Sequence, residues 1–278
     1  MEAEVNKERL SPAKRHLLEQ HMLGMAGQKR SEAVRPRSAA AAVPLSPEQR
    51  RVWLHAAQHP ELPLYNESVT IRRHGSFDLG ILEASLNEIL RRHEIWRTSF
   101  LLDGKTLIHG DVHVTLPLVD MSGLPPAERE AEALRLAAEN AHEPVPLDRA
   151  PLFRARVVRM KEDEHRLYLT LHHIIFDGVS ISRIFLPELS AIYASYERGE
   201  PSPLTPPALQ YGDYALWREQ HVNSLAVKQH LAYWFQQLSG ELPVLQLPVD
   251  RPQPAIASHR GSAECFQVPP DLLEKLRV

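Results

Sequence analysis

The amino-acid sequence predicts an α/β fold, in which strands of a sheet alternate with flanking helices. Residues 167–176 are mostly apolar and contain no glycine or proline, which is typical of a buried strand. Residues 126–142 are rich in alanine, glutamate and arginine and favour an amphipathic helix. Apolar residues of another stretch recur at helical spacing: Leu82, Leu86, Ile89 and Leu90.

The first predicted elements carry local start signals. Ser46 and Gln49, with a proline between them, fit a capping box and predict a helix through about Gln58. Residues 66–73 alternate in character and predict a strand. Asp78 can then cap the helix that carries the leucine-rich stripe.

The middle of the chain predicts two pairs of antiparallel strands. Asp103-Gly104 lies between two short apolar runs and favours a tight hairpin turn. Residues 152–160 predict a strand that the polar turn KEDE joins to the strand at 167–171. The helix at 126–142 has these inward-facing candidates: Ala133, Leu134 and Ala137.

Prolines divide the remaining part of the chain. Pro187 predicts a break or kink near Phe185 to Pro187 in a helix that ends at Gly199. The proline-rich loop at 201–210 is expected to separate a first subdomain from the rest of the chain. Residues 211–238 favour one helix with a large apolar surface, and we expect this tail to be poorly packed or to oligomerise.

Composition limits the classes of function. The net charge of -3, with 43% hydrophobic and 24% charged residues, is ordinary for a globular chain and suggests no polyanionic partner. No apolar run approaches the ~20 residues that span a bilayer. The charged start, MEAEVNKERLSP, does not fit a secretory signal, so a cytoplasmic protein without nucleic-acid or membrane partners is expected. Cys265 is the single cysteine, which excludes an intrachain disulfide and favours a small buried side chain.

The sequence HHIIFDG is the main candidate for chemistry. Successive side chains of a strand point to opposite faces, so His172 and His173 cannot both face one site. One is therefore a candidate chemical group and the other a scaffold group. In an extended strand His173 and Asp177 are roughly 13 Å apart. A direct hydrogen bond would require the chain to curl, and otherwise the carboxylate most simply binds an arginine.

The residues after this sequence allow further roles. A helix that starts after Gly178 would leave backbone amides to face a developing negative charge, and Ser180 can cap its first turn. Zinc is not expected, because adjacent histidines on a strand diverge and no third ligand follows at a recognisable spacing. An acyl-enzyme at Ser180 is disfavoured, because the sequence lacks the G-x-S-x-G setting.

Four stretches together resemble one family. HHIIFDG at 172–178 resembles the HHxxxDG motif of nonribosomal peptide synthetase condensation domains, which share a core with chloramphenicol acetyltransferase-like acyltransferases. LSPEQRRVWL at 45–54, RRHEIWRTSF at 91–100 and YGDYALW at 211–217 resemble the family's first, second and fourth motifs, in the expected order. The resemblance runs from about Pro44 to the last residue and covers the first part of the family's domain.

The resemblance implies an organisation and a set of site residues. It implies a chloramphenicol acetyltransferase-like subdomain with a mixed sheet at 44–205, then a connector and an incomplete second subdomain at 206–278. Residues 1–43 would be a helix and linker that joins an upstream carrier protein, docks onto a partner chain or forms a disordered tail. The site residues it implies are His173 as the active-site histidine, His172 packed behind it, and Asp177 and Gly178 in a turn that Arg97 holds by pairing with Asp177.

The implied activity is amide formation. An amino acid on a downstream carrier's 4'-phosphopantetheine arm would attack an acyl or peptidyl thioester on an upstream carrier. Carrier proteins and adjacent synthetase domains would then be the partners, and no cofactor would bind this chain directly. An epimerization-type relative and a non-catalytic carrier-docking module are the alternatives. We expect weak or no turnover from the 278-residue chain alone.

Overall fold

The computed structural model separates into two compact units, Met1–Val227 and Lys228–Val278. It describes residues 33–38, 41–75, 77–222, 224–252 and 266–277. Cys265 and the helix expected to start at Ser11 lie outside the described residues. The first unit contains the sheet, the helices that cover it and the candidate site.

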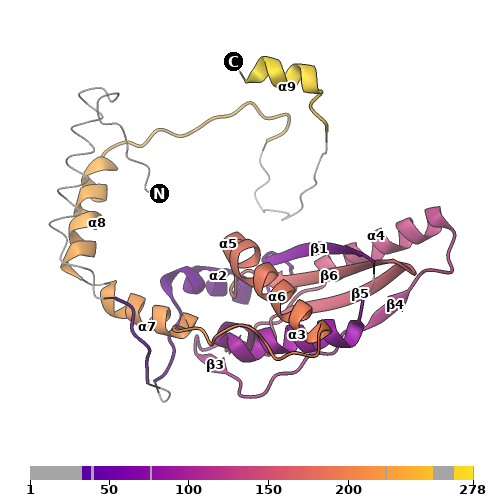
Figure 1. Ribbon diagram of the computed structural model, residues 1–278. Helices are drawn as coiled ribbons and strands as arrows, with labels where there is room; N and C mark the ends of the chain where they lie inside the picture. Colours follow the sequence, from indigo (N-terminus) through magenta and orange to yellow (C-terminus); the bar gives the residue numbers. More distant parts are fainter. Residues whose placement is uncertain (1–32, 39–40, 76, 223, 253–265, 278) are drawn as a thin grey trace, which may run out of the picture. The chain divides into compact units, whose positions relative to one another are not determined.

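A four-stranded mixed sheet forms the centre of the first unit (Figure 1). Its strands, in spatial order, are β1 (Asn66–His74), β6 (Glu164–His172), β5 (Phe153–Lys161) and β4 (Leu118–Asp120). The pairs β1–β6 and β5–β6 are antiparallel, whereas β4 and β5 are parallel. The predicted strands and the antiparallel pairing of the last two are confirmed.

Helices cover both faces of this sheet (Figure 1). On one face α3 (Leu79–Arg92) and α6 (Leu186–Glu197) pack in the main hydrophobic core, and α4 (Pro126–His142) packs in a second core on the other face. The predicted leucine-rich stripe of α3 is at most 6% exposed. Each such side chain contributes about 1.5–3 kcal/mol by leaving water. The mixed α/β architecture is therefore as expected.

Strand β6 is buried on both faces. Leu167, Leu169 and Leu171 belong to the core with α3 and α6, whereas Tyr168 belongs to the core with α4. This alternation places β6 in the middle of the molecule, and its last residue is His172. The chain that leaves β6 therefore starts from a rigid position.

Two predicted caps and the predicted hairpin are present. Ser46 begins α2 (Pro47–Gln58) with the full capping box, and the Asp78 side chain accepts a hydrogen bond from Ile81 N at the start of α3. After the short helix η2 (Glu94–Arg97), β2 (Thr98–Phe100) and β3 (Thr106–Ile108) form the hairpin.

The irregularity predicted near Pro187 is a π-helical turn. The helix α5 (Gly178–Ser180) continues into the π turn η3 (Ile181–Phe185), where Leu186 N donates to Ile181 O, and then into α6. Because proline has no backbone N–H, the wider turn leaves it at the start of α6 without a broken ladder.

Two expectations were wrong in detail. Leu134 in α4 is 62% exposed, although Ala133 is buried and Ala137 packs in the second core. The helix expected at 211–238 is divided into α7 (Tyr211–His221) and α8 (Leu225–Gln237). The first compact unit continues through Val227, so α7 belongs to it, and the subdomain boundary expected after residue 205 stays a prediction.

The second compact unit is mostly irregular where it is described. Its C-terminal helix is α9 (Pro270–Leu276). Neither α9 nor α8 contains a buried residue, in line with the expected poor packing of the tail. Among the described residues of the whole chain, no helix is both long and apolar enough to cross a membrane.

Candidate active site

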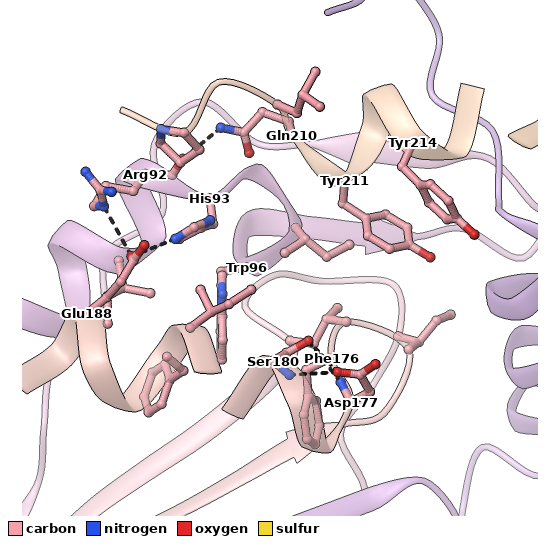
Figure 2. Close-up of a pocket in the computed structure, with 18 of the residues that line it drawn as sticks. Arg92, His93, Trp96, Phe176, Asp177, Ser180, Glu188, Gln210, Tyr211 and Tyr214 are labelled. Carbon is pink, nitrogen blue, oxygen red and sulfur yellow. Dashed lines mark hydrogen bonds and ion pairs between the residues drawn. The ribbon is translucent and has the colours of Figure 1, made fainter. Parts of the chain in front are cut away.

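A large pocket opens in the first unit where β6 ends (Figure 2). Its volume is about 1270 Å³, and both the candidate histidine stretch and the proline-rich loop line it. The turn after β6 forms one side, and residues 204–214 form the opposite side. We call residues 172–180 the histidine turn and residues 204–214 the wall.

His172 is the scaffold member of the histidine pair. It is the last residue of β6 and is 4% exposed. Its Nδ1 accepts a hydrogen bond from Ile174 N at 3.2 Å, so the neutral ring carries its proton on Nε2. Burial, with a smaller contribution from the nearby charge of His173, lowers the pKa of His172 to about 4. His172 is therefore neutral and packed, as predicted.

His173 lies one residue beyond the strand and lines the pocket. Its backbone N donates to Tyr65 O at 2.8 Å, and its ring stacks on Phe176 with centroids 5.4 Å apart. The residue is exposed, unlike His172. The structure thus separates the two histidines into a buried ring and a ring that faces the pocket.

Asp177 serves a different role from the one expected. Its Oδ1 accepts from Ser180 N and from Ser180 Oγ, both at 2.7 Å, and so caps α5. Hydrogen bonds from Ser180, and more weakly the charge of His173, lower the pKa of Asp177. Ser180 is thus the partner of the cap and not the cap itself. Its amide binds this carboxylate instead of waiting for a substrate oxyanion.

Arg97 does not pair with Asp177 in the described structure, which corrects the expectation. Arg97 ends η2, and its guanidinium donates to His109 O beside the β2–β3 hairpin. The Asp177 carboxylate is already occupied by local donors, so it needs no arginine. Gly178 starts α5 with open space around its Cα and is not a point of close backbone approach.

Gln49 supports the histidine turn, a role that the sequence analysis missed. Its side chain is buried, and its Nε2 donates to Ile174 O at 3.2 Å. The same amide accepts a hydrogen bond from Ser46 N through Oε1. The capping box of α2 therefore binds the residue next to His173. The sequence pattern identified the box but gave no sign of this contact.

A charged cluster at the other end of the pocket was also missed (Figure 2). Glu188 Oε2 contacts His93 Nε2 at 2.8 Å and accepts from Arg92 Nε at 3.2 Å. Hydrogen bonds from His93 and Arg92 outweigh the effect of burial and lower the pKa of Glu188. Arg92 also donates to Leu204 O and Thr205 O, at 3.0 and 2.8 Å. This cluster ties α3 and α6 to the wall.

The remainder of the wall is held by Gln210 and the start of α7. Gln210 Nε2 donates to Arg92 O at 2.9 Å, and its Oε1 accepts from Glu94 N at 3.0 Å. Tyr211 and Tyr214, which follow on α7, line the pocket (Figure 2). The Tyr211 hydroxyl is 2.9 Å from Ser46 Oγ, and burial raises the pKa of Tyr211.

These features limit the chemistry of the pocket. The described residues contain no cluster of three or more metal-ligating side chains. His173 is an exposed imidazole that can exchange a proton with a bound molecule, and tyrosines and apolar side chains surround the remaining space. The arrangement suits proton transfer to or from a substrate that is positioned by its other contacts.

Comparisons with known proteins agree on one family. The family model "Condensation domain" matches residues 39–278. The chain is 41% identical over 238 residues to part of a linear gramicidin synthase from Brevibacillus parabrevis, which covers 84% of this chain and 5% of that synthase protein. The chain therefore spans a small part of the length of this curated relative.

Solved structures show the same fold. The complex of the X-domain and OxyB from teicoplanin biosynthesis matches with a TM-score of 0.71 and 32% identity, covering 82% of this chain and 50% of that chain. The starter condensation domain of rhizomide synthetase RzmA matches with a TM-score of 0.63 and 22% identity, covering 72% and 48%. These likenesses confirm the predicted chloramphenicol acetyltransferase-like fold.

Proposed function

The chain belongs to the condensation domain family, and we propose that it is a condensation-type acyltransferase of nonribosomal peptide synthesis. It would form an amide between an acyl or peptidyl thioester on an upstream carrier and an amino acid on a downstream carrier. The observation that carries this proposal is the placement of His173, exposed and lining the pocket directly after a buried strand.

His173 is the proposed proton acceptor. The amine nitrogen of the acceptor attacks the thioester carbonyl carbon, so that a C–N bond forms and the C–S bond breaks. The imidazole takes the proton that the amine loses, and the departing thiolate finally receives a proton. Such proton transfer contributes about 10²- to 10⁴-fold, so positioning of the two tethered substrates provides much of the remaining acceleration.

The substrates would reach the pocket on protein partners. Each would be a thioester on the 4'-phosphopantetheine arm of a carrier protein, with adjacent synthetase domains presenting the carriers. The chain itself would then hold no cofactor. A pocket of about 1270 Å³ exceeds the usual ~300–1,000 Å³ of small-molecule sites, which favours long, tethered substrates.

A single-turnover assay tests this function. Two carriers, one loaded with an acyl group and one with an amino acid, are mixed with the 278-residue chain and the amide product is measured. Replacing His173→Ala should lower the rate about 10²- to 10⁴-fold. His142→Ala, at the end of α4 on the other face of the sheet, is the matched control. Equal rates for the two variants would reject the proposed role of His173.

A non-catalytic docking module is the second candidate. One observation favours it: the X-domain, 32% identical to this chain, was solved as a complex with the protein OxyB. A chain of this kind would bind a carrier and yield no amide in the same assay. An epimerization-type relative would instead change the configuration of a carrier-bound residue, which chiral analysis of the released product would detect.

A further inference from the structure

Arg37 binds the first turn of α7. Its backbone N and its Nη1 both donate to Asp213 Oδ1, at 3.1 and 2.9 Å, and its Nη2 donates to Glu94 Oε2 at 2.6 Å. The Arg37 side chain is 9% exposed and the Asp213 side chain 5%. One guanidinium therefore joins η2 and α7 in a shielded position, where an ion pair is weakened less by solvent.

Steric packing supports the same arrangement. A Cβ added to Gly212 would lie 3.1 Å from Arg37 Cζ and 3.0 Å from Val43 Cγ2. The chain before α2 and the start of α7 thus meet without room for a methyl group, and Figure 1 shows this indigo segment passing beside α7. Arg37 precedes residues 39–278, which the family model matches, so this contact is not part of the matched region.

The part of α7 that Arg37 binds also shapes the pocket. Asp213 Oδ2 accepts from Gln210 N at 2.8 Å, so the carboxylate that holds Arg37 also caps α7. Tyr211 in the same turn lines the pocket and contacts Ser46 Oγ, which accepts from Gln49 N. Gln49 then binds Ile174 O, next to His173. A continuous set of contacts therefore leads from Arg37 to the histidine turn.

We propose that Arg37 is a positioning residue that sets the α7 side of the pocket. When Arg37 is bound, Tyr211 and Tyr214 stay in the pocket wall and α2 stays fixed against the histidine turn. When it is removed, the charges of Asp213 and Glu94 lose their shared partner and the first turn of α7 loosens. This inference concerns the shape of the pocket and does not depend on which reaction occurs there.

Amide hydrogen exchange of the full 278-residue chain tests the proposal. Arg37→Ala should speed exchange in residues 211–221 about tenfold and leave β5 and β6 unchanged, because local units open independently of the core. Arg35→Ala is the matched control, since Arg35 is an exposed arginine of the same segment. Arg37→Lys should give an intermediate result, because a single ammonium cannot reproduce the forked contact to both carboxylates.

A spectroscopic signature separates positioning from general stabilisation. Burial raises the pKa of Tyr211, so loosening α7 should lower it, as seen in phenolate absorbance after subtracting a Tyr211→Phe variant in each background. Gly212→Ala should produce the same two changes by pushing Arg37 away, although alanine normally favours a helix. The proposal is wrong if Arg37→Ala matches Arg35→Ala in both measurements, or if exchange rises equally in α7 and β6.

Discussion

The two sides of the pocket are held in place by different kinds of interaction. The histidine turn continues a strand that is buried on both faces, and backbone contacts fix it: His172 N donates to Leu152 O and His173 N to Tyr65 O. The wall is mostly irregular, with only the start of α7 helical, and depends on the side chains of Arg92, Gln210 and Arg37.

This difference has a functional consequence. The side that carries His173 cannot move without disturbing the core, so its geometry is fixed by folding. The wall depends on a few charged side chains, and a change in any of them alters the pocket while the sheet stays intact. In a carrier-dependent enzyme this division would keep the reacting group constant and let the binding surface vary.

The largest expected effect tests whether the wall depends on Arg92. Arg92→Ala should lower the free energy of unfolding by about 3–5 kcal/mol, because it leaves Glu188 and two wall carbonyls without their donor in a shielded position. Urea denaturation measures this change. Residues 204–210 should also become more sensitive to proteolysis, which would show that the effect is centred on the wall.

The neighbouring residue provides the control for this substitution. Arg91 pairs with Glu88 on the same helix, but its side chain is 70% exposed. Arg91→Ala should therefore cost no more than about 1 kcal/mol. Similar losses for Arg91→Ala and Arg92→Ala would mean that the wall does not depend on the buried guanidinium.

The second prediction concerns the buried side of the pocket and uses pH. The pKa of His172 is about 4 in the folded chain and about 6.5 when unfolded, so the unfolded state binds the proton first as pH falls. Stability from the neutral ring is complete above about pH 6.5 and is lost as pH falls toward 4. Between pH 7 and pH 5 the wild type should lose about 2 kcal/mol more than His172→Gln. Parallel losses in urea denaturation would contradict burial of this ring.

The sequence predicted those features that depend on residues close together in the chain. The caps at Ser46 and Asp78, the leucine-rich stripe of α3 and the hairpin at Asp103-Gly104 each involve a few neighbouring positions. The separation of His172 from His173 followed from strand alternation alone. The family motifs then indicated which of the two histidines faces the pocket.

The contacts that build the wall were not predictable in this way. Arg92 and Leu204 are 112 positions apart, and Arg37 and Asp213 are 176 apart. Charged residues of this kind look like solvated surface groups in a sequence, since local periodicity says nothing about their partners. Arg97 shows the converse error, because the motif that contains it suggested a partner whose carboxylate is already used by Ser180.

That carboxylate gives the smallest and most specific prediction. Asp177→Ala removes the cap of α5 and should lower the free energy of unfolding by about 1 kcal/mol, whereas Asp177→Asn should keep most of it. The folded pKa of Asp177 is lowered, so its charged cap stabilises the chain above the ordinary aspartate pKa of about 3.9 and is lost as pH falls below it. Urea denaturation across this pH range should show that loss in wild type and not in Asp177→Asn.

The cap at Asp78 is the matched comparison, since it begins α3 far from the histidine turn in sequence and binds Ile81 N. Asp78→Ala should cost a similar ~1 kcal/mol but leave amide formation unchanged. Asp177→Ala should also slow amide formation, because the turn that orients His173 ends at this cap. If both alanine variants reduce the rate equally, the effect comes from general stability, and the turn is not the part of the pocket that Asp177 protects.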